Sequence, residues 1–341
     1  MAESELGEVA RFLGTVFGVG ESHRMFQPDV LRWKCCVPHP FWQGSRGYAL
    51  RYKGGIAAFG CLVPIRFLTG SGTVASCNVI DWAASKTIPG AGVTLYRHIQ
   101  GLTGTMINIG GTSDARQVLP QIGFEVRADI HHYTRVLRPW RHFRMDDRRD
   151  WKSPLRLVRD YSELMRATRG EHSLIARRIT SFESVSAAAL PDPSVTRQIV
   201  CARTPESLDY FMACPAAQVD AYLLERGSAA VGYFLLSRVG CQCRVADLWI
   251  RSMDQQQWAE GYAAAAAVAR QDPEITEITA AASLALAAGA LQKAGFRPTH
   301  TEPVFVLDPD RLLAGRNDLA VGLLENDAFY WSAGGVSLQA G

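Results

Sequence analysis

Apolar and polar positions recur with two different periods along the first part of the chain. Over Glu5–Phe17 the apolar residues have the spacing of one helix face, and Pro28–Lys34 predicts a second helix with proline in its first turn. Tyr48–Tyr52 and Ile56–Phe67 are apolar runs separated by two glycines, so they predict a β-hairpin that turns at Lys53–Gly55. The N-terminal part is therefore expected to mix helices and strands.

The pattern is densest over Cys77–Phe124. Buried strands are predicted at Cys77–Trp82 and Met106–Ile109, and helices at Val93–Ile99 and Thr112–Gln121. The order is strand, turn, helix, strand, helix. Such alternation is typical of an α/β protein in which helices flank a sheet.

The turn between the first of these strands and its helix is Thr87–Gly92, which contains Gly90 and Gly92. Glycine lets a backbone approach a ligand closely, and the first N–H groups of a helix have no partner within the helix. Those N–H groups point at any anion bound there. The turn is therefore a candidate pyrophosphate site.

A further strand is predicted at Asp129–Val136, and the character of the chain then changes. Arg138–Lys152 is rich in arginine and aspartate, which predicts a solvated linker; the alternative is a basic face that binds an anionic ligand or a membrane surface. Beyond it, a strand is predicted at Leu155–Val158 and a helix at Tyr161–Thr168.

The second part of the chain repeats landmarks of the first. Ala57–Gly60 recurs as Ala229–Gly232, and Gly123–Phe124 recurs as Gly295–Phe296, both at a shift of 172 residues. Landmarks in one order at one shift predict a duplicated domain. We expect an N-terminal domain over residues 1–137, a basic linker over 138–152, a C-terminal domain over 153–310 and a tail over 311–341.

The two copies differ at the turn. In the second copy the corresponding strand is Val245–Ile250, and the residues that follow it, Arg251–Gln257, contain no glycine. The alanine-rich helix that runs on to Ala269 is well formed by composition, because alanine is the best helix former. The second copy is therefore expected to keep the fold and to lack the pyrophosphate site.

Composition narrows the class of protein. Hydrophobic residues make up 48% and charged residues 20% of the 341 residues, and a net charge of +3 is too small to indicate nucleic-acid binding. The acidic start is unlike a signal peptide, and the apolar run Ala263–Ala269 is much shorter than a membrane span of about 20 residues. We expect a soluble, cytoplasmic protein.

The cysteines and histidines do not predict a metal site. The eight cysteines form no Cys-x-x-Cys pair and lie mostly in apolar runs, which indicates reduced, buried thiols. Cys241 and Cys243 share a strand face but have no nearby third ligand, and the adjacent His131 and His132 point to opposite faces. No metal is therefore expected.

The chain has a glycine turn and, at the end of the following helix–strand–helix segment, the pair Gly123–Phe124. In these features it resembles the GNAT acyltransferase superfamily. That family carries an Arg/Gln-x-x-Gly-x-Gly/Ala turn, and Thr87–Gly92 matches both glycines but has threonine in the first position. The family often ends its fourth helix with Tyr-x-x-x-Gly-Phe, and Leu119–Phe124 keeps Gly-Phe but has leucine for tyrosine. The resemblance covers residues 1–137 and, more weakly, 153–310.

The resemblance implies an α/β (α+β) fold of two tandem GNAT-like domains, each a mixed, twisted sheet flanked by helices. It implies a sheet that opens between its fourth and fifth strands, where an acyl-CoA cosubstrate, acetyl-CoA or another, inserts its pantetheine arm. Mapped onto this chain, the cofactor-binding residues are Trp82 and Ala84 beside pantetheine, and Thr87, Gly90, Ala91, Gly92 and Val93 around the pyrophosphate.

Acyl transfer to an amine also needs proton transfer, and two residues are candidates for it. Asp81 lies within an apolar strand, where burial would make a carboxylate a stronger base; the alternative is a structural aspartate, as at Asp247 of the second copy. Ser113 follows the next strand, near the position expected for the thiol of CoA. The alternative is a helix cap formed by Thr112–Asp114.

The sequence thus predicts an acyl-CoA-dependent N-acyltransferase that transfers an acyl group, acetyl by preference, to an amine of a small molecule or sugar by direct attack. The alternative is a non-catalytic tandem GNAT module that binds acyl-CoA or a partner. An aminoacyl transferase of the peptidoglycan-bridge type also has two such domains, but no feature of the sequence favours it. No nucleic-acid partner is expected.

Overall fold

The computed structural model describes residues 1–20, 23–145, 151–167, 174–192, 194, 198–313 and 319–331. Part of the predicted linker, residues 146–150, lies outside the described residues, as do Thr168 and residues 314–318 and 332–341 of the predicted tail.

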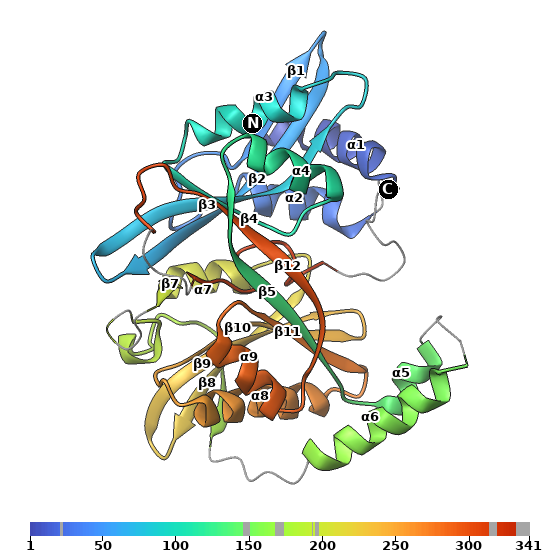
Figure 1. The fold of residues 1–341 in the computed structure, drawn as a ribbon, viewed down its shortest axis with the longest axis vertical. Helices are drawn as coiled ribbons and strands as arrows, with labels where there is room; N and C mark the ends of the chain where they lie inside the picture. The colour runs from blue at the N-terminus through green and yellow to red at the C-terminus, as the bar shows by residue number, and fades with distance from the viewer. Residues whose placement is uncertain are drawn as a thin grey trace.

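The elements of the N-terminal half agree with the hydrophobic pattern (Figure 1). They are the 3-10 turns Glu3–Glu5 and Arg24–Phe26, the helices α1 (Leu6–Phe17), α2 (Pro28–Cys35), α3 (Ala91–Gln100) and α4 (Ser113–Gln121), and the strands β1 (Gly47–Tyr52), β2 (Gly55–Thr69), β3 (Gly72–Ala84), β4 (Thr105–Ile109) and β5 (Glu125–Val136). Each helix and strand predicted in this half is confirmed, with boundaries shifted by a few residues.

The C-terminal half continues in the same manner. Its helices are α5 (Pro139–Met145), α6 (Ser153–Ala167), α7 (Pro205–Met212), α8 (Gln255–Gln271) and α9 (Ala285–Lys293), with a 3-10 turn at Ala187–Ala189; its strands are β6 (Ile175–Ile179), β7 (Ile199–Cys201), β8 (Gln218–Arg226), β9 (Ala229–Val239), β10 (Gln242–Ile250), β11 (Glu277–Ala282), β12 (Arg297–Leu307) and β13 (Leu319–Ala320).

One predicted element is wrong. Leu155–Val158 lies within α6 and is not a strand. A run of four residues cannot separate strand from helix by periodicity, and Leu155 and Val158, three residues apart, share one exposed helix face instead. The predicted linker also contains the helix α5, in which Arg141 binds Glu274 of the C-terminal half.

The two halves repeat one order of elements. The series α2-β1-β2-β3-α3-β4-α4-β5 is followed by α7-β8-β9-β10-α8-β11-α9-β12. The last three elements of each series begin at residues 105, 113 and 125 and at residues 277, 285 and 297, the shift of 172 seen in the sequence. The predicted fold class, two tandem domains of mixed sheet and helices, is confirmed.

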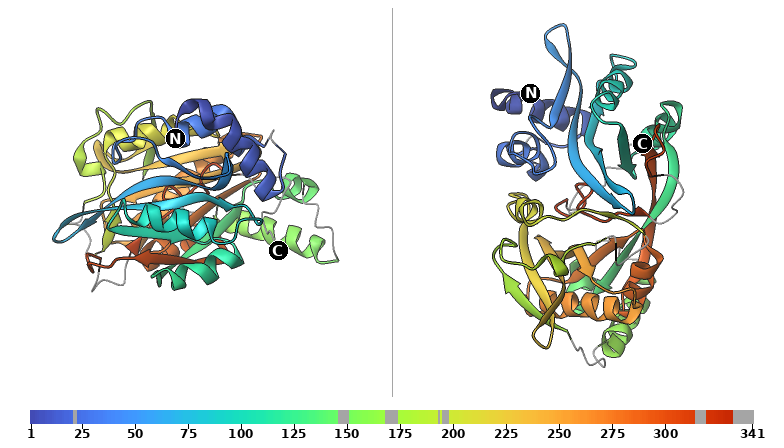
Figure 2. Two further views of the ribbon diagram at one scale, coloured as in Figure 1. Left: turned by 90° about the horizontal axis from the view of Figure 1, so that it is seen from above. Right: turned by 90° about the vertical axis from the view of Figure 1, so that its left-hand side faces the viewer.

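The halves exchange their last strands within one continuous sheet. The strand order places β12 between β4 and β5, and β5 between β12 and β11, all antiparallel. The two long strands therefore run together across the middle of the molecule, with β1–β4 at one end and β8–β11 at the other (Figure 1 and Figure 2). Each half is completed by a strand of the other half, so the two repeats do not form separate sheets. The domain boundaries at residues 137 and 153 therefore remain a proposal.

Equivalent residues of the two halves meet at their junction. Trp33 of α2 and Tyr210 of α7, separated by the shift of 177 that also relates Pro28 and Pro205, stack with ring centroids 4.9 Å apart. The Trp33 indole N–H donates to the Tyr210 carbonyl at 3.3 Å, and the Tyr210 hydroxyl donates to the Trp33 carbonyl at 3.0 Å. Such reciprocal contacts are the signature of a two-fold interface.

The core follows this arrangement. One cluster lies between α3 and the sheet of the N-terminal half, and includes Leu95, Tyr96 and Ile99. A larger cluster runs from α1 and α2 through the C-terminal half and takes in Phe329 and Tyr330 of the tail. Within the described residues, none of the helices has the length and apolar character required to cross a membrane.

Candidate functional site

The sheet opens in the N-terminal half between β3 and β4. The two strands pair only between Ser76–Asn78 and Thr105–Ile107, after which β3 continues to Ala84 with β2 on its other side. Within the described part of the chain, the edge of β3 that faces β4 therefore has no strand partner over its last residues, which include Trp82 and Ala84. This is the kind of opening that the sequence resemblance implies.

The glycine turn joins the end of β3 to the start of α3. Gly90 precedes the helix with a φ of 78°, in the left-handed region that favours glycine. Gly92 and Val93 follow in the first helical turn, where backbone N–H groups lack partners within the helix. The Ala91 N–H donates to the Ile88 carbonyl at 3.3 Å, so this N–H, unlike those of Gly92 and Val93, is engaged within the turn. Among the residues that the structure describes, no side chain caps this helix end.

The side chain of Trp82 positions this turn, a role that the sequence did not reveal. Its indole N–H donates to the Gly92 carbonyl at 3.1 Å, and its ring packs edge-on against Tyr96 with centroids 4.6 Å apart. A Cβ atom on Gly92 would lie 3.1 Å from the Ala84 Cβ. Glycine here allows α3 to begin directly against β3. Thr87 is exposed, and its hydroxyl lies 2.8 Å from that of Ser85.

Asp81 lies in a buried ion pair. Its carboxylate is 2.8 Å from the Lys34 ammonium, and the two side chains are 5% and 1% exposed. Burial alone would lower the pKa of Lys34, but the charges of Asp81 and Asp327 raise it above its ordinary value. Asp81 also has a φ of 52°, a strained conformation beside a β-bulge opposite Gly60. This carboxylate is fixed by the fold.

Asp327 belongs to the same cluster, and sequence reasoning missed it. Burial, followed by the charge of Asp81, raises the pKa of Asp327 to about 6, while Lys34 acts in the opposite direction. The sequence feature that could have pointed to Asp327 is an acidic residue within the largely apolar tail segment Leu323–Tyr330. The cluster therefore holds one cation and two carboxylates.

Ser113 lies at the start of α4 and is exposed. The residue that caps the helix is Thr112, whose hydroxyl accepts from the Ala115 N–H at 3.3 Å. The structure thus places Asp81 in the interior and Ser113 at the surface, and brings neither to the N–H groups of the glycine turn. Leu119, which stands in the usual place of the family's tyrosine, is fully buried.

The same opening exists in the C-terminal half, but its helix end is closed. β10 and β11 pair only between Gln242–Arg244 and Glu277–Thr279. At the start of α8 the carboxylate of Asp254 accepts from the Gln256 N–H at 2.8 Å. A carboxylate therefore occupies the place that a phosphate would need, in accord with the missing glycines.

A hollow occupies this second opening. About 80 Å³ of it is accessible to the centre of a water molecule, and it is lined by β10, β11, α8 and α9 together with residues of β7, β9 and the tail. Aromatic side chains from several elements line it, namely Tyr233, Trp249, Trp258 and Tyr262. Trp249 is 5% exposed, and its indole N–H has no hydrogen-bond partner among the described residues.

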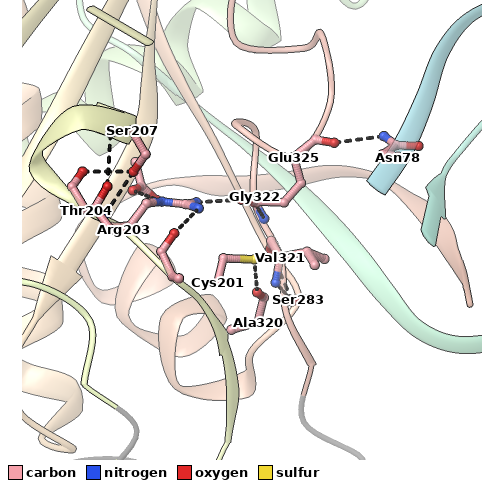
Figure 3. A network of polar contacts seen from close by, with 12 residues as sticks. Asn78, Cys201, Arg203, Thr204, Ser207, Ser283, Ala320, Val321, Gly322 and Glu325 are labelled. Atoms are coloured by element: carbon pink, nitrogen blue, oxygen red, sulfur yellow. Dashed lines mark hydrogen bonds and ion pairs between the residues drawn. The ribbon is translucent and has the colours of Figure 1, made fainter. Parts of the chain in front are cut away.

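A buried charge network borders the hollow, and Figure 3 shows two of its members, Arg203 and Glu325. The Arg203 guanidinium contacts Asp247 at 2.8 Å and Glu325 at 2.5 Å, and the Tyr233 hydroxyl donates to Asp247 at 2.6 Å. Burial alone would lower the pKa of Arg203, but the two carboxylates raise it well above its ordinary value. The network again combines one cation with two carboxylates.

Glu325 connects the two openings. Its backbone carbonyl accepts from the Asn78 side-chain amide at 2.8 Å, and its carboxylate accepts from the Gly322 N–H at 2.7 Å (Figure 3). Asn78 is the last residue of β3 that pairs with β4. The tail therefore links the point where the first opening begins to the charged wall of the second.

Comparison with known proteins identifies the fold. No protein-family model matches the chain, and no curated protein matches it in sequence. A Saccharomyces cerevisiae N-myristoyltransferase with bound myristoyl-CoA and inhibitors is similar in structure, with a TM-score of 0.61 at 11% identity over 90% of this chain and 78% of that one.

Two GCN5-related N-acetyltransferases are also similar to this chain in structure. The protein from Anabaena variabilis has a TM-score of 0.57 at 10% identity, over 89% of this chain and 70% of that one. The protein from Kribbella flavida also has a TM-score of 0.57, at 14% identity over 93% of this chain and 73% of that one. The chain therefore has the GNAT fold, and the resemblance predicted from the sequence is confirmed at that level.

Proposed function

We propose that this protein is an acyl-CoA-dependent N-acyltransferase that binds its cosubstrate in the N-terminal half. The observation that carries the proposal is the uncapped start of α3, which follows Gly90 directly beyond the opening between β3 and β4. Free N–H groups at the positive end of a helix bind phosphate oxygens. Known proteins with this fold, among them one with bound myristoyl-CoA, support acyl-CoA as the ligand.

In this proposal the pyrophosphate lies against the N–H groups of Gly90, Gly92 and Val93. The pantetheine arm lies along the free edge of β3, beside Trp82 and Ala84. Backbone groups make these contacts, so threonine at position 87 in place of Arg or Gln does not prevent binding.

The acceptor is proposed to be an amine of a small molecule or sugar, bound in the hollow of the C-terminal half. The two carboxylates of Asp247 and Glu325 outnumber the one cation, Arg203, so the wall of the hollow keeps a net negative charge that attracts an ammonium group. The free N–H of Trp249 suits an acceptor oxygen on the same molecule. Aromatic walls supply flat apolar surface, and Glu325 links this hollow to β3.

The chemistry proposed is direct attack. The neutral amine nitrogen forms a bond to the thioester carbonyl carbon, the carbon–sulfur bond breaks, and CoA leaves as a thiolate that takes up a proton. A thiol has a pKa of roughly 8.5, so this leaving group departs near neutral pH without a dedicated acid. Because Asp81 is held by Lys34, we propose that it supports the fold and that the amine loses its proton to solvent.

The eight cysteines are all free thiols and six of them are buried, which fits the reducing cytoplasm that we propose as the location.

The test is to incubate the purified chain with acyl-CoAs from acetyl to myristoyl and a panel of amines and amino sugars. Release of free thiol and an acylated amine in the mass spectrum would support the enzyme. Tight binding of acyl-CoA without acylation of any amine would support the alternative, a non-catalytic module. Absence of acyl-CoA binding would refute the enzyme and leave only a module that binds another partner.

A further inference from the structure

Two histidines and a glutamate come together where the exchanged strands cross. His132 lies on β5, and His300 and Glu302 lie on β12, so the three come from opposite ends of the duplication. His132 and His300 are direct cross-strand partners, and their rings stack with centroids 4.1 Å apart and an interplanar angle of 10°. We propose that these three residues bind a divalent transition-metal ion, with Zn²⁺ best suited to the donor set.

The donor atoms are close enough for one ion. The His132 Nε2 lies 3.1 Å from the Glu302 Oε2, and one ligand atom from each of the three residues lies within 4.8 Å of the others. Zinc bonds of about 2.0–2.2 Å to nitrogen and oxygen in a tetrahedron place neighbouring ligand atoms roughly 3.3–3.5 Å apart. A rotation of the exposed His300 side chain would be needed to bring all three atoms to that spacing.

The surrounding hydrogen bonds leave the lone pair of His300 available. The Thr299 hydroxyl donates to the His132 carbonyl at 3.1 Å, so its oxygen is left to accept from the His300 Nδ1, 3.2 Å away. The proton of His300 is then on Nδ1, and Nε2 carries the free lone pair. A hydrogen bond that fixes the tautomer in this way is the usual support of a metal-binding histidine.

The Glu302 carboxylate lies close against an adjacent turn. A Cβ atom on Gly110 would lie 2.8 Å from the Glu302 Oε1, so a side chain at position 110 would displace this carboxylate. The Gly110 N–H donates to the Pro303 carbonyl at 3.0 Å, which fixes the turn to β12. The site therefore joins β5, β12 and the end of β4.

The sequence did not suggest this site because its residues are far apart in the chain. His131 and His132 do point to opposite faces, as expected: His131 contacts Thr301 at 2.9 Å and takes no part. The ion would tie together the two exchanged strands. Three protein ligands leave a fourth position for water or a ligand.

The test uses the full chain without a histidine tag, stripped of metal with a chelator. Titration with Zn²⁺ should show one ion per chain, and Co²⁺ should give the visible absorption of a tetrahedral site. His300→Gln and Glu302→Gln should each weaken Zn²⁺ binding by about tenfold or more. Glu302→Asp, which keeps a carboxylate, should retain part of the affinity.

His131→Gln is the matched control, because it removes the neighbouring histidine from the same strand and should leave affinity unchanged. Circular dichroism of each variant confirms that it is folded. Failure of the wild-type chain to bind Zn²⁺ would overturn the proposal. So would binding that survives both the His300 and Glu302 substitutions in folded protein, since the ion would then lie elsewhere.

Discussion

The two halves of this molecule share an architecture and differ at one helix end. Each has a sheet that opens after a short pairing, followed by a helix that begins beside the opening. In the N-terminal half, Gly90 leaves the start of α3 uncapped; in the C-terminal half, Asp254 places its own carboxylate at the start of α8. If the start of α3 binds pyrophosphate as proposed, the residue at the helix end, and not the fold alone, distinguishes the two halves.

Whereas the helix ends differ between the halves, both halves contain a buried ion pair. Asp81 pairs with Lys34, and Asp247 pairs with Arg203. The tail supplies the second carboxylate to each cation: Glu325 contacts Arg203, and the charge of Asp327 raises the pKa of Lys34. Because the pair exists in the half without a glycine turn, we propose that it supports the fold and is not part of the proposed acyl-CoA site.

The largest effect is expected from Asp81→Asn. Removing one partner of a buried ion pair typically costs about 3–5 kcal/mol, so the free energy of unfolding should fall by that order while acyl-CoA affinity holds in the folded fraction. Urea denaturation measures the first and calorimetry the second. Asp247→Asn is the matched change in the other half. If turnover falls by about 10² to 10⁴ with stability unchanged, Asp81 is a catalytic base.

Next in size is Gly90→Asp, which should weaken CoA binding about a hundredfold or more, because it sets a carboxylate against the pyrophosphate. Gly90→Asn separates charge from shape: asparagine tolerates positive φ, so its variant should retain most of the affinity. Gly240→Asp, at another glycine of positive φ in the turn before β10, should leave binding intact. An unaffected Gly90→Asp variant would place the cosubstrate elsewhere.

A smaller effect of opposite sign is expected from Asp327→Asn. The folded pKa of about 6 lies above the unfolded value of about 3.9, so the folded state holds more protons between these values and stability falls as pH rises through that window. The asparagine side chain of the variant does not ionise, so the variant does not lose stability in this way. It should be more stable than wild type by about 1–3 kcal/mol at pH 7.5 and equal near pH 4. Thermal unfolding at both pH values measures this; lower stability at pH 7.5 would show that Lys34 requires both carboxylates.

The smallest effect should come from Trp249→Phe, which removes the free indole N–H and keeps an aromatic ring in the hollow. Loss of one hydrogen bond should raise the KM for the amine about two- to tenfold and leave acyl-CoA affinity unchanged. Trp258→Phe is the control, since its N–H already donates to the Ser252 carbonyl at 2.8 Å. If only Trp258→Phe raises the KM, the acceptor is not held by Trp249.

The elements and the duplication were predictable because they depend on local patterns. The helix at Pro28–Cys35 and the hairpin around Lys53–Gly55 follow from spacing and turn chemistry, and the shift of 172 follows from Gly60 and Gly232. The position of Gly90 at a helix start was predictable for the same reason.

The rest depends on contacts between distant residues. The exchange of β5 and β12 is a pairing choice that neither strand's own sequence specifies. Lys34 gave no sign that it pairs with Asp81, and Asp327 reaches the same cluster from the far end of the chain. The hollow is lined by strands, helices and tail residues that are far apart in the sequence and meet only in the folded state.

Hydrogen–deuterium exchange of the full chain, with and without saturating CoA, tests the central claim most directly. Because the first N–H groups of α3 are proposed to bind the pyrophosphate, CoA should slow exchange in peptides that cover Gly90–Val93. The start of α8, where Asp254 already caps the helix, should exchange equally with and without CoA. Protection at the start of α8, or no change at α3 while CoA is bound, would contradict the account.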